Sequence, residues 1–235
     1  MRKAFTLSEV LITLSIVGVI AVLTIPPVMK NYRNRLYVAQ LQKVSAQIEN
    51  AMQQMMNDEH VDNFLETKVL SPNVNEDEEN PMSGVEYFFT NYFKTAKVNC
   101  TVGTDKNSCF ASSYSTINGN KTMTGGQSVL CSGNTVNDGF CVQTTNGAAI
   151  KWSYNSSNRI PTLVIDVNGI SEPNVIGRDL FLVDIRDGNR LVDPTPAEQC
   201  NVKTSGWSQG NVDRVNAYAA GCYNRVVDDG WKMEY

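Results

Sequence analysis

A single acidic side chain, Glu9, lies inside the most apolar part of this 235-residue chain. Residues 5–25 form an apolar run with no other charge, and Arg2 and Lys3 precede it. A carboxylate is costly to hold inside a membrane-length helix, so its presence predicts a functional role and a partner. The run contains no basic side chain. We therefore expect the neutralising partner to come from another molecule.

The densest group of polar residues lies at 166–179, where DVNG is followed by PN, a glycine and an aspartate. Asp166, Asn168, Asn174 and Asp179 offer the hard oxygen ligands that Ca²⁺ prefers, and no other cofactor is expected. The segment departs from an EF-hand loop, which needs more carboxylates and a terminal Glu. The alternative interpretation is structural: Asn, Gly and Pro set the turns between two strands, and the Asp side chains cap backbone N–H groups.

The cysteines all follow the apolar run: Cys100, Cys109, Cys131, Cys141, Cys200 and Cys222. No CxxC pair occurs and His60 is the only histidine, so disulfides formed in an oxidising compartment are favoured over a zinc site. Six cysteines allow many pairings, and spacing alone does not choose among them. Loop-closure entropy favours the near pairs Cys100–Cys109 and Cys131–Cys141, which leaves Cys200–Cys222.

The remaining composition argues against several classes of function. The formal net charge is −4, and an acidic chain without a basic stripe is not expected to bind nucleic acid strongly. Neither a P-loop nor a GxGxxG fingerprint occurs. Catalytic Ser/His/Asp and Cys/His arrangements both require a histidine, and the chain has only one, so we do not expect an enzyme.

The element that positions Glu9 is predicted to be one long helix. At about 1.5 Å per residue, residues 5–25 span about 31 Å, close to the ~30 Å hydrocarbon core of a bilayer. After Pro26-Pro27, an apolar stripe recurs at spacings of three and four from Leu36 to Met55. We expect a helix from Phe5 to about Asn57, transmembrane over 5–25 and amphipathic beyond, with a kink or melted turn at the prolines.

Residues 58–235 are expected to form one globular domain. Residues 99–147 are rich in Asn, Gly, Ser and Thr, a composition that builds little core and relies on disulfides. The domain is predicted to contain a short helix at 85–93, strands at 149–154, 162–166 and 180–185, a hairpin turn at Asp187-Gly188-Asn189 and a late helix at 212–227. The order predicts an α+β fold whose long N-terminal helix packs its amphipathic half on an antiparallel β-sheet.

The segment KAFTLSEVLITLSIVGVIAVLTIP resembles the N-terminal signal and helix of type IV pilins and type II secretion pseudopilins. The resemblance is specific over about 25 residues and covers little of the rest, although DVNG with PN is similar to a segment of some bacterial pilin-like domains. It implies that a prepilin peptidase removes residues 1–4 by cutting between Ala4 and Phe5, and methylates Phe5. The family usually has Gly where this chain has Ala4. Glu9 would then neutralise the Phe5 amine of a neighbouring subunit, since both charges need a partner in lipid.

The resemblance also implies a function and a location. The chain would be a pilin-like structural subunit of a type IV pilus or a type II secretion pseudopilus. It would cross the bacterial inner membrane once, with its N-terminus cytoplasmic and its C-terminal domain exported to the periplasm or cell surface. Its partners would be the prepilin peptidase, the assembly platform, and like subunits or other pilins joined through N-terminal helices into a filament.

Other readings of the same residues remain open. A membrane-anchored minor or tip pilin could act as an adhesion or ligand-binding module through its Asn/Ser/Thr-rich loops. A cleaved secretory signal, a plain single-span anchor and an anchored periplasmic hydrolase are further alternatives. Pro26-Pro27 followed by Val28-Met29-Lys30 is a poor site for secretory cleavage, and a plain anchor leaves Glu9 unexplained.

Mass spectrometry of the mature protein tests the processing step. We expect loss of residues 1–4 and a methylated Phe5 at the new terminus, because Lys3-Ala4-Phe5-Thr6-Leu7 stands directly ahead of Glu9. A mature terminus beyond Pro26 would instead identify an ordinary secreted protein.

Overall fold

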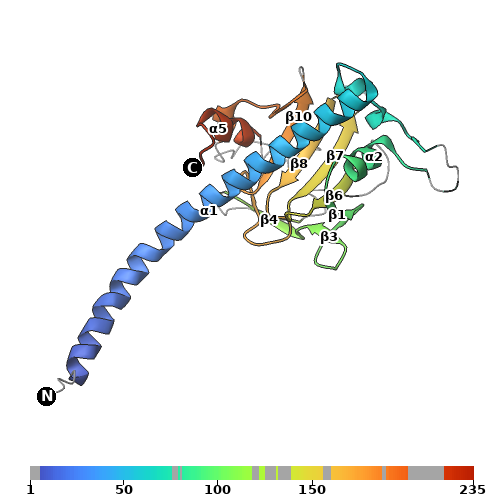
Figure 1. Ribbon diagram of the computed structural model, residues 1–235. Helices are drawn as coiled ribbons and strands as arrows, with labels where there is room; N and C mark the ends of the chain where they lie inside the picture. Colours follow the sequence, from blue (N-terminus) through green and yellow to red (C-terminus); the bar gives the residue numbers. More distant parts are fainter. Residues whose placement is uncertain are drawn as a thin grey trace.

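One long helix and one β-sheet organise the chain. The computed structural model describes residues 6–75, 79, 81–117, 122–124, 131, 139–155, 160–186, 189–200 and 220–235. Helix α1 (Leu7–Glu59) projects its first half away from the domain and lays its second half across one face of the sheet (Figure 1). This is the α+β arrangement with a long N-terminal helix that the sequence predicts.

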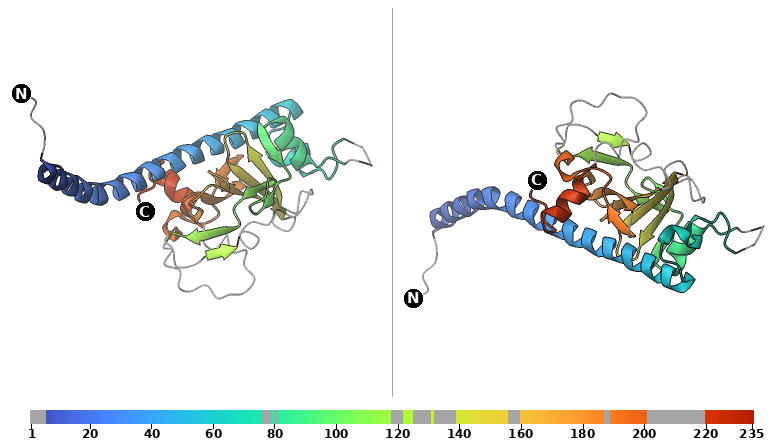
Figure 2. Two further views of the ribbon diagram at one scale, coloured as in Figure 1. Left: turned by 90° about the horizontal axis from the view of Figure 1, so that it is seen from below. Right: turned by 90° about the horizontal axis from the view of Figure 1, so that it is seen from above.

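Helix α1 is continuous through Pro26 and Pro27, so the predicted melted turn does not form. The helix instead curves over its apolar half (Figure 2). A proline inside a helix removes one N–H donor and crowds the preceding turn, and a bend relieves that crowding without breaking the remaining ladder. The last helical residue is Glu59, two residues beyond the predicted Asn57, and the left-handed backbone of His60 (φ 56°) terminates the helix.

Short helices close one end of the sheet. Two 3₁₀ turns, η1 (Phe64–Glu66) and η2 (Lys68–Leu70), lead to α2 (Gly84–Asn91), which confirms the short helix predicted at 85–93. Ser83 caps α2, because its hydroxyl oxygen accepts from the Glu86 N–H at 3.2 Å. The ring of Phe64 lies edge-on to Phe88 and to Trp152, with centroids 5.1 and 6.2 Å apart. These rings fill the space between the helices and the sheet.

The main sheet has nine strands in the order β1-β6-β7-β8-β10-β9-β4-β5, and β11 also pairs with β10. The strands are β1 (Thr95–Val98), β4 (Ser113–Thr116), β5 (Thr122–Thr124), β6 (Phe140–Thr144), β7 (Ala149–Asn155), β8 (Ile160–Asp166), β9 (Val175–Ile176), β10 (Leu180–Arg186) and β11 (Arg190–Val192). A separate pair joins β2 (Thr101–Val102) to β3 (Ser108–Phe110). Strands β7, β8 and β10 confirm the three strands predicted from the sequence.

The sheet is mixed rather than purely antiparallel. Strands β6, β7, β8 and β10 pair antiparallel as predicted, but β9 pairs parallel with both β10 and β4. A short loop at residues 177–179 follows β9. The chain then enters β10 running in the same direction as β9, so the two strands pair in parallel. Strand β11 returns antiparallel to β10, with Arg190 opposite Arg186. The predicted turn residues Asp187 and Gly188 lie outside the described residues.

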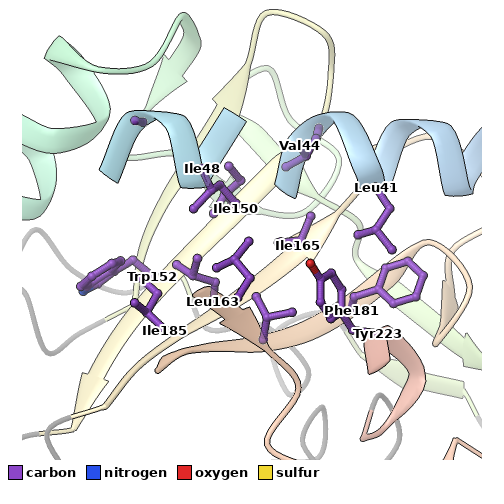
Figure 3. Close-up of a cluster of buried hydrophobic side chains, with 14 of the residues drawn as sticks. Leu41, Val44, Ile48, Ile150, Trp152, Leu163, Ile165, Phe181, Ile185 and Tyr223 are labelled. Carbon is purple, nitrogen blue, oxygen red and sulfur yellow. The ribbon is translucent and has the colours of Figure 1, made fainter. Parts of the chain in front are cut away.

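The main core lies between α1 and the sheet. Side chains on one stripe of α1 are almost fully buried, and alternate side chains of β7, β8 and β10 face them (Figure 3). The helix contributes Leu41, Val44, Ile48, Met52 and Met55, and the sheet contributes Ile150, Trp152, Leu163, Ile165, Phe181 and Val183. The intervening residues of the same strands form a second cluster on the other face with Phe110, Tyr114 and Ile176. Both faces of the sheet are therefore covered.

Three disulfides tie the loop-rich parts of the domain together. They join Cys100 to Cys109, Cys131 to Cys141, and Cys200 to Cys222. The first two are the near pairs that loop-closure entropy favours, and the third joins the two cysteines that remain. The third bridge connects the end of η3 (Ala197–Gln199) to α5 (Cys222–Asp228). The described part of the predicted late helix begins at Cys222, and residues 201–219 lie outside the described residues.

Two leucines on α1 provide a matched test of the core. Leu41 is 0% exposed and Leu36 is 42% exposed, so Leu41→Ala leaves a cavity and Leu36→Ala does not. We expect the free energy of unfolding to fall by about 3 kcal/mol for Leu41→Ala and by less than about 0.5 kcal/mol for Leu36→Ala. Chemical denaturation of the full chain in detergent measures both. Equal losses would contradict the packing of this stripe.

Candidate functional site

The first half of α1 exposes an apolar surface that no described residue of the chain covers. By length and composition this helix is able to cross a membrane. Its large apolar side chains from Leu7 to Met29 are each 42–80% exposed: Leu7, Val10, Leu11, Ile12, Leu14, Ile16, Val17, Val19, Ile20, Val22, Leu23, Ile25, Val28 and Met29. A soluble monomer rarely exposes so continuous an apolar surface, so lipid or other helices are needed to cover it.

Glu9 lies in the first turn of α1, and Thr6 binds its carboxylate. The backbone N–H and the hydroxyl of Thr6 both donate to Glu9 Oε2 at 2.8 Å, and the Glu9 N–H donates to Thr6 Oγ1 at 3.3 Å. Although the run contains no basic side chain, it does supply Glu9 with hydrogen-bond donors. The spacing Thr-x-x-Glu is a capping-box signature, and it is the signal that predicts this contact.

Thr6 donates two hydrogen bonds to one oxygen atom of the Glu9 carboxylate but brings no positive charge. Within the described chain, the ion pairs are Arg186–Asp184 and Arg225–Asp229, and neither involves Glu9. The two residues predicted to flank the cleavage site, Ala4 and Phe5, lie outside the described residues. Among the described residues, the charge of Glu9 therefore has no ion-pair partner.

The segment between β8 and β10 contains two buried aspartates, both 0% exposed. Asp166 ends β8: its Oδ2 accepts from the Tyr114 hydroxyl at 2.6 Å and its Oδ1 from the Asn168 N–H at 3.2 Å. Asp179 precedes β10, and its Oδ1 accepts from the Val175 N–H at 2.7 Å. Among the described residues, nothing donates to Asp179 Oδ2. The aspartates thus cap backbone N–H groups, as the structural interpretation of this segment predicts.

The asparagines of the segment tie its turns. Asn168 donates to the Ser171 carbonyl, and its buried Oδ1 has no partner in the described chain. In the amide orientation that satisfies both of its polar atoms, Asn174 donates to the carbonyls of Gly169 and Ser171 at 3.2 Å. The motif therefore builds the connection from β8 to β10.

Two glycines of the motif are required by close contacts. Gly169 has φ +62°, and a Cβ there would lie 2.7 Å from the Gly147 carbonyl oxygen. Gly177 has φ +81°, and its Cβ would lie 2.8 Å from Cys222 Sγ. Both positions combine a left-handed backbone with no room for a side chain. The second contact joins this connection to the C-terminal helix and its disulfide.

Burial sets the charge state of this aspartate pair. It raises the pKa of Asp166 to about 7, against the partial opposing effect of the Tyr114 and backbone hydrogen bonds. Burial and the neighbouring Asp166 raise the pKa of Asp179 well above its usual value. Burial and Asp166 likewise raise the pKa of Tyr114. Nothing in the sequence indicates Tyr114, which comes from a strand far from Asp166 along the chain.

At neutral pH, the buried carboxyl groups of Asp166 and Asp179 must either be protonated or bind a cation. Among the described residues, Asp179 Oδ2 and Asn168 Oδ1 are buried oxygen atoms without partners, and a calcium ion binds oxygen atoms of this kind. Both oxygen atoms of Asp166 are already engaged. Within the described residues, no group of three or more His, Cys, Asp or Glu side chains is arranged to hold a metal. The calcium set of Asp166, Asn168, Asn174 and Asp179 stays a prediction.

Comparisons of the chain with protein-family models, with curated proteins and with solved structures found no match. The function is therefore inferred from the residues and their geometry.

The aspartate pair predicts how stability depends on pH. The Asp166 pKa rises from 3.8 to about 7 on folding, so between these values the folded state keeps a proton that the unfolded chain releases. Its contribution to stability is complete below about pH 4 and is lost as pH rises to about 7. Without calcium, we expect the free energy of unfolding to fall by about 2–4 kcal/mol from pH 4 to pH 8.

Denaturant titrations of the full chain across this pH range, with a chelator present, measure the effect. Asp166→Asn keeps an acceptor for Tyr114 and should reduce the fall in stability with pH, leaving the part that comes from Asp179 and Asp193, which also have raised pKa values. The exposed Asp62→Asn should not reduce it. A wild-type profile as flat as that of Asp166→Asn would contradict protonation of the pair. A rise in melting temperature with added Ca²⁺ at pH 8, absent in Asp166→Asn, would establish the cation site instead.

Proposed function

We propose that this chain is a structural subunit of a type IV pilus or of a type II secretion pseudopilus. In this proposal, a prepilin peptidase cuts between Ala4 and Phe5, and the subunit waits in the inner membrane with its domain exported. The subunit then joins a filament through its N-terminal helix. The observation that carries the proposal is an uncovered apolar half-helix with one carboxylate, continuous with a half-helix that is part of a domain core.

The exposed apolar surface of α1 is suited to lipid before assembly and to neighbouring helices in a filament afterwards. Because the apolar side chains surround the first half of the helix, this half is suited to lipid on every side before assembly. Small residues such as Gly18 and Ala21 interrupt that surface, and nothing lies within 4 Å of the Cβ position at Gly18. Neighbouring helices are able to approach closely at such positions, which suits a bundle in a filament.

The capping box stabilises the Glu9 carboxylate before assembly. Thr6 supplies two hydrogen bonds to the carboxylate, which lower the cost of the group while a subunit is alone. Hydrogen bonds from a neutral residue do not cancel its charge, however. The amine of a cleaved neighbour would do so, and attraction between opposite charges is strong in a low-dielectric surrounding. Assembly would therefore be favoured by neutralising two charges that are costly when separate.

The geometry of such an assembly is open-ended. Each subunit presents a helix surface that meets a different surface of the next subunit, so the contact is heterologous and does not close on itself. The domain lies beside the second half of α1 and leaves the first half clear (Figures 1 and 2). The apolar halves are thus able to gather at the centre while the domains face outward.

Substitution of Glu9 tests the proposed pairing. We expect Glu9→Ala and Glu9→Gln to insert in the membrane and to lose the leader normally, because the span becomes more apolar and the cut site is untouched. Incorporation into sheared filaments should fall at least tenfold in both variants, since the incoming amine would meet no counter-charge. Immunoblots of sheared filaments and of membranes measure both pools.

Glu49→Gln is the matched control, because it removes an exposed carboxylate from the packed half of the same helix. It should assemble like wild type. If both Glu9 variants also assemble like wild type, the amine pairing is wrong, and a membrane-anchored tip or minor subunit with a binding role becomes the better description.

A further inference from the structure

A groove of about 750 Å³ lies where α1 leaves the domain. One wall is a face of α1 and the other is the C-terminal segment 231–234, which runs beside the middle of the helix (Figure 1). The Asn34 amide donates to the Met233 carbonyl at 3.0 Å and joins the two walls. Val38 and Met233 are buried at its base. The groove is thus a fixed feature of the join between helix and domain.

The groove is lined by more positive than negative charge. Lys30, Arg35 and Lys232 line it, and Glu234 is its one acidic residue. The three basic residues are exposed. Neither of the ion pairs found in the described chain, Arg186–Asp184 and Arg225–Asp229, involves a residue of the groove. Asn31 and Gln42 add neutral hydrogen-bonding groups. This combination suits an anion that carries several acceptor oxygens.

The position of the groove along α1 points to the source of that anion. The predicted transmembrane stretch, residues 5–25, spans about 31 Å and ends about 7.5 Å before Lys30 along the helix axis. Lys30 is the first charged residue after this stretch, and Arg35 lies about 7 Å further along the axis. The headgroup layer on each side of the core is about 5–8 Å thick. When residues 5–25 span the core, Lys30 therefore lies in the headgroup layer, and Arg35 lies just outside it, where its long side chain is able to reach back to the headgroups.

We propose that this groove binds the headgroup phosphate of an anionic phospholipid in the exported leaflet. The inference rests on the proposed membrane insertion of α1. The guanidinium of Arg35 and the amines of Lys30 and Lys232 contact the phosphate oxygens. The acyl chains of the same lipid lie along the exposed apolar half of the helix. Trp231, half-buried in the groove wall, is of the type that favours this interface.

A lipid accounts for the site better than an acidic protein segment does. The groove is continuous with a surface that must face lipid, so a lipid fills both at once. Both walls also contribute charge, from Lys30 and Arg35 on the helix and from Lys232 on the C-terminal segment. A bound phosphate would thereby hold the segment and the helix together in addition to the Asn34–Met233 bond.

Native mass spectrometry of the full chain tests the proposal. The protein is reconstituted in nanodiscs that hold equal amounts of phosphatidylglycerol and phosphatidylcholine, and the lipids that remain bound on release are counted. We expect wild type to retain phosphatidylglycerol in excess. Lys30→Gln with Arg35→Gln should reduce that excess about fivefold per charge removed. Lys43→Gln with Arg190→Gln removes the same two residue types from exposed positions outside the groove, and should retain the excess.

Three results would overturn the inference. Wild type could retain the two lipids equally, or both double variants could lose the excess to the same extent, which would indicate only a general attraction. The groove variants could instead lose contacts between copies of the chain without any lipid preference, which would make a second copy the occupant. Alkaline carbonate extraction of membranes from cells that express the chain separates these results from failure of the proposed function. An extractable chain would refute membrane insertion itself, whereas a retained chain without lipid preference refutes only the groove's role.

Discussion

Burial of one stripe of α1 against the sheet is the interaction on which the rest of the structure depends. Leu41, Val44 and Ile48 lie over alternate side chains of β7, β8 and β10, and the same strands bury their other side chains on the opposite face. Because α1 supplies part of the domain core, removing it would leave one apolar face of the sheet uncovered. The uncovered first half continues the same helix without a break, so it is joined to the domain core by continuous helical backbone.

The second constraint is electrostatic. Glu9 and the pair of Asp166 and Asp179 are ionisable groups in surroundings where water is scarce or expected to be scarce. The solutions differ. The aspartates are part of the core, where hydrogen bonds to backbone N–H groups and raised pKa values make them compatible with burial. Glu9 stands on an exposed helix end with only Thr6 beside it, which fits a group that meets its counter-charge later.

Features that depend on local patterns were predictable from the sequence. The stripe from Leu41 to Met55 follows helical spacing, the strands at β7, β8 and β10 follow from β-branched alternation, and short loops favoured the disulfide pairs that the structure contains. Features that depend on distant contacts were not. The parallel pairing of β9 needs the loop at 177–179, and the hydroxyl of Tyr114 reaches Asp166 only because β4 and β8 belong to one sheet. At Pro26 the sequence predicted one long helix with either a kink or a melted turn, and the structure has the continuous, bent form.

The orientation of α1 on the sheet has a mechanical consequence. A pull on the apolar half, directed along the helix axis, loads the contacts of the buried stripe in parallel rather than one after another. Such shear loading divides the force among many side chains, whereas a sideways pull would peel the helix away turn by turn. The Asn34–Met233 bond stands at the edge of the stripe nearest the projecting half and would resist the start of peeling. The fold is therefore strongest in the direction in which a fibre built from it would carry tension.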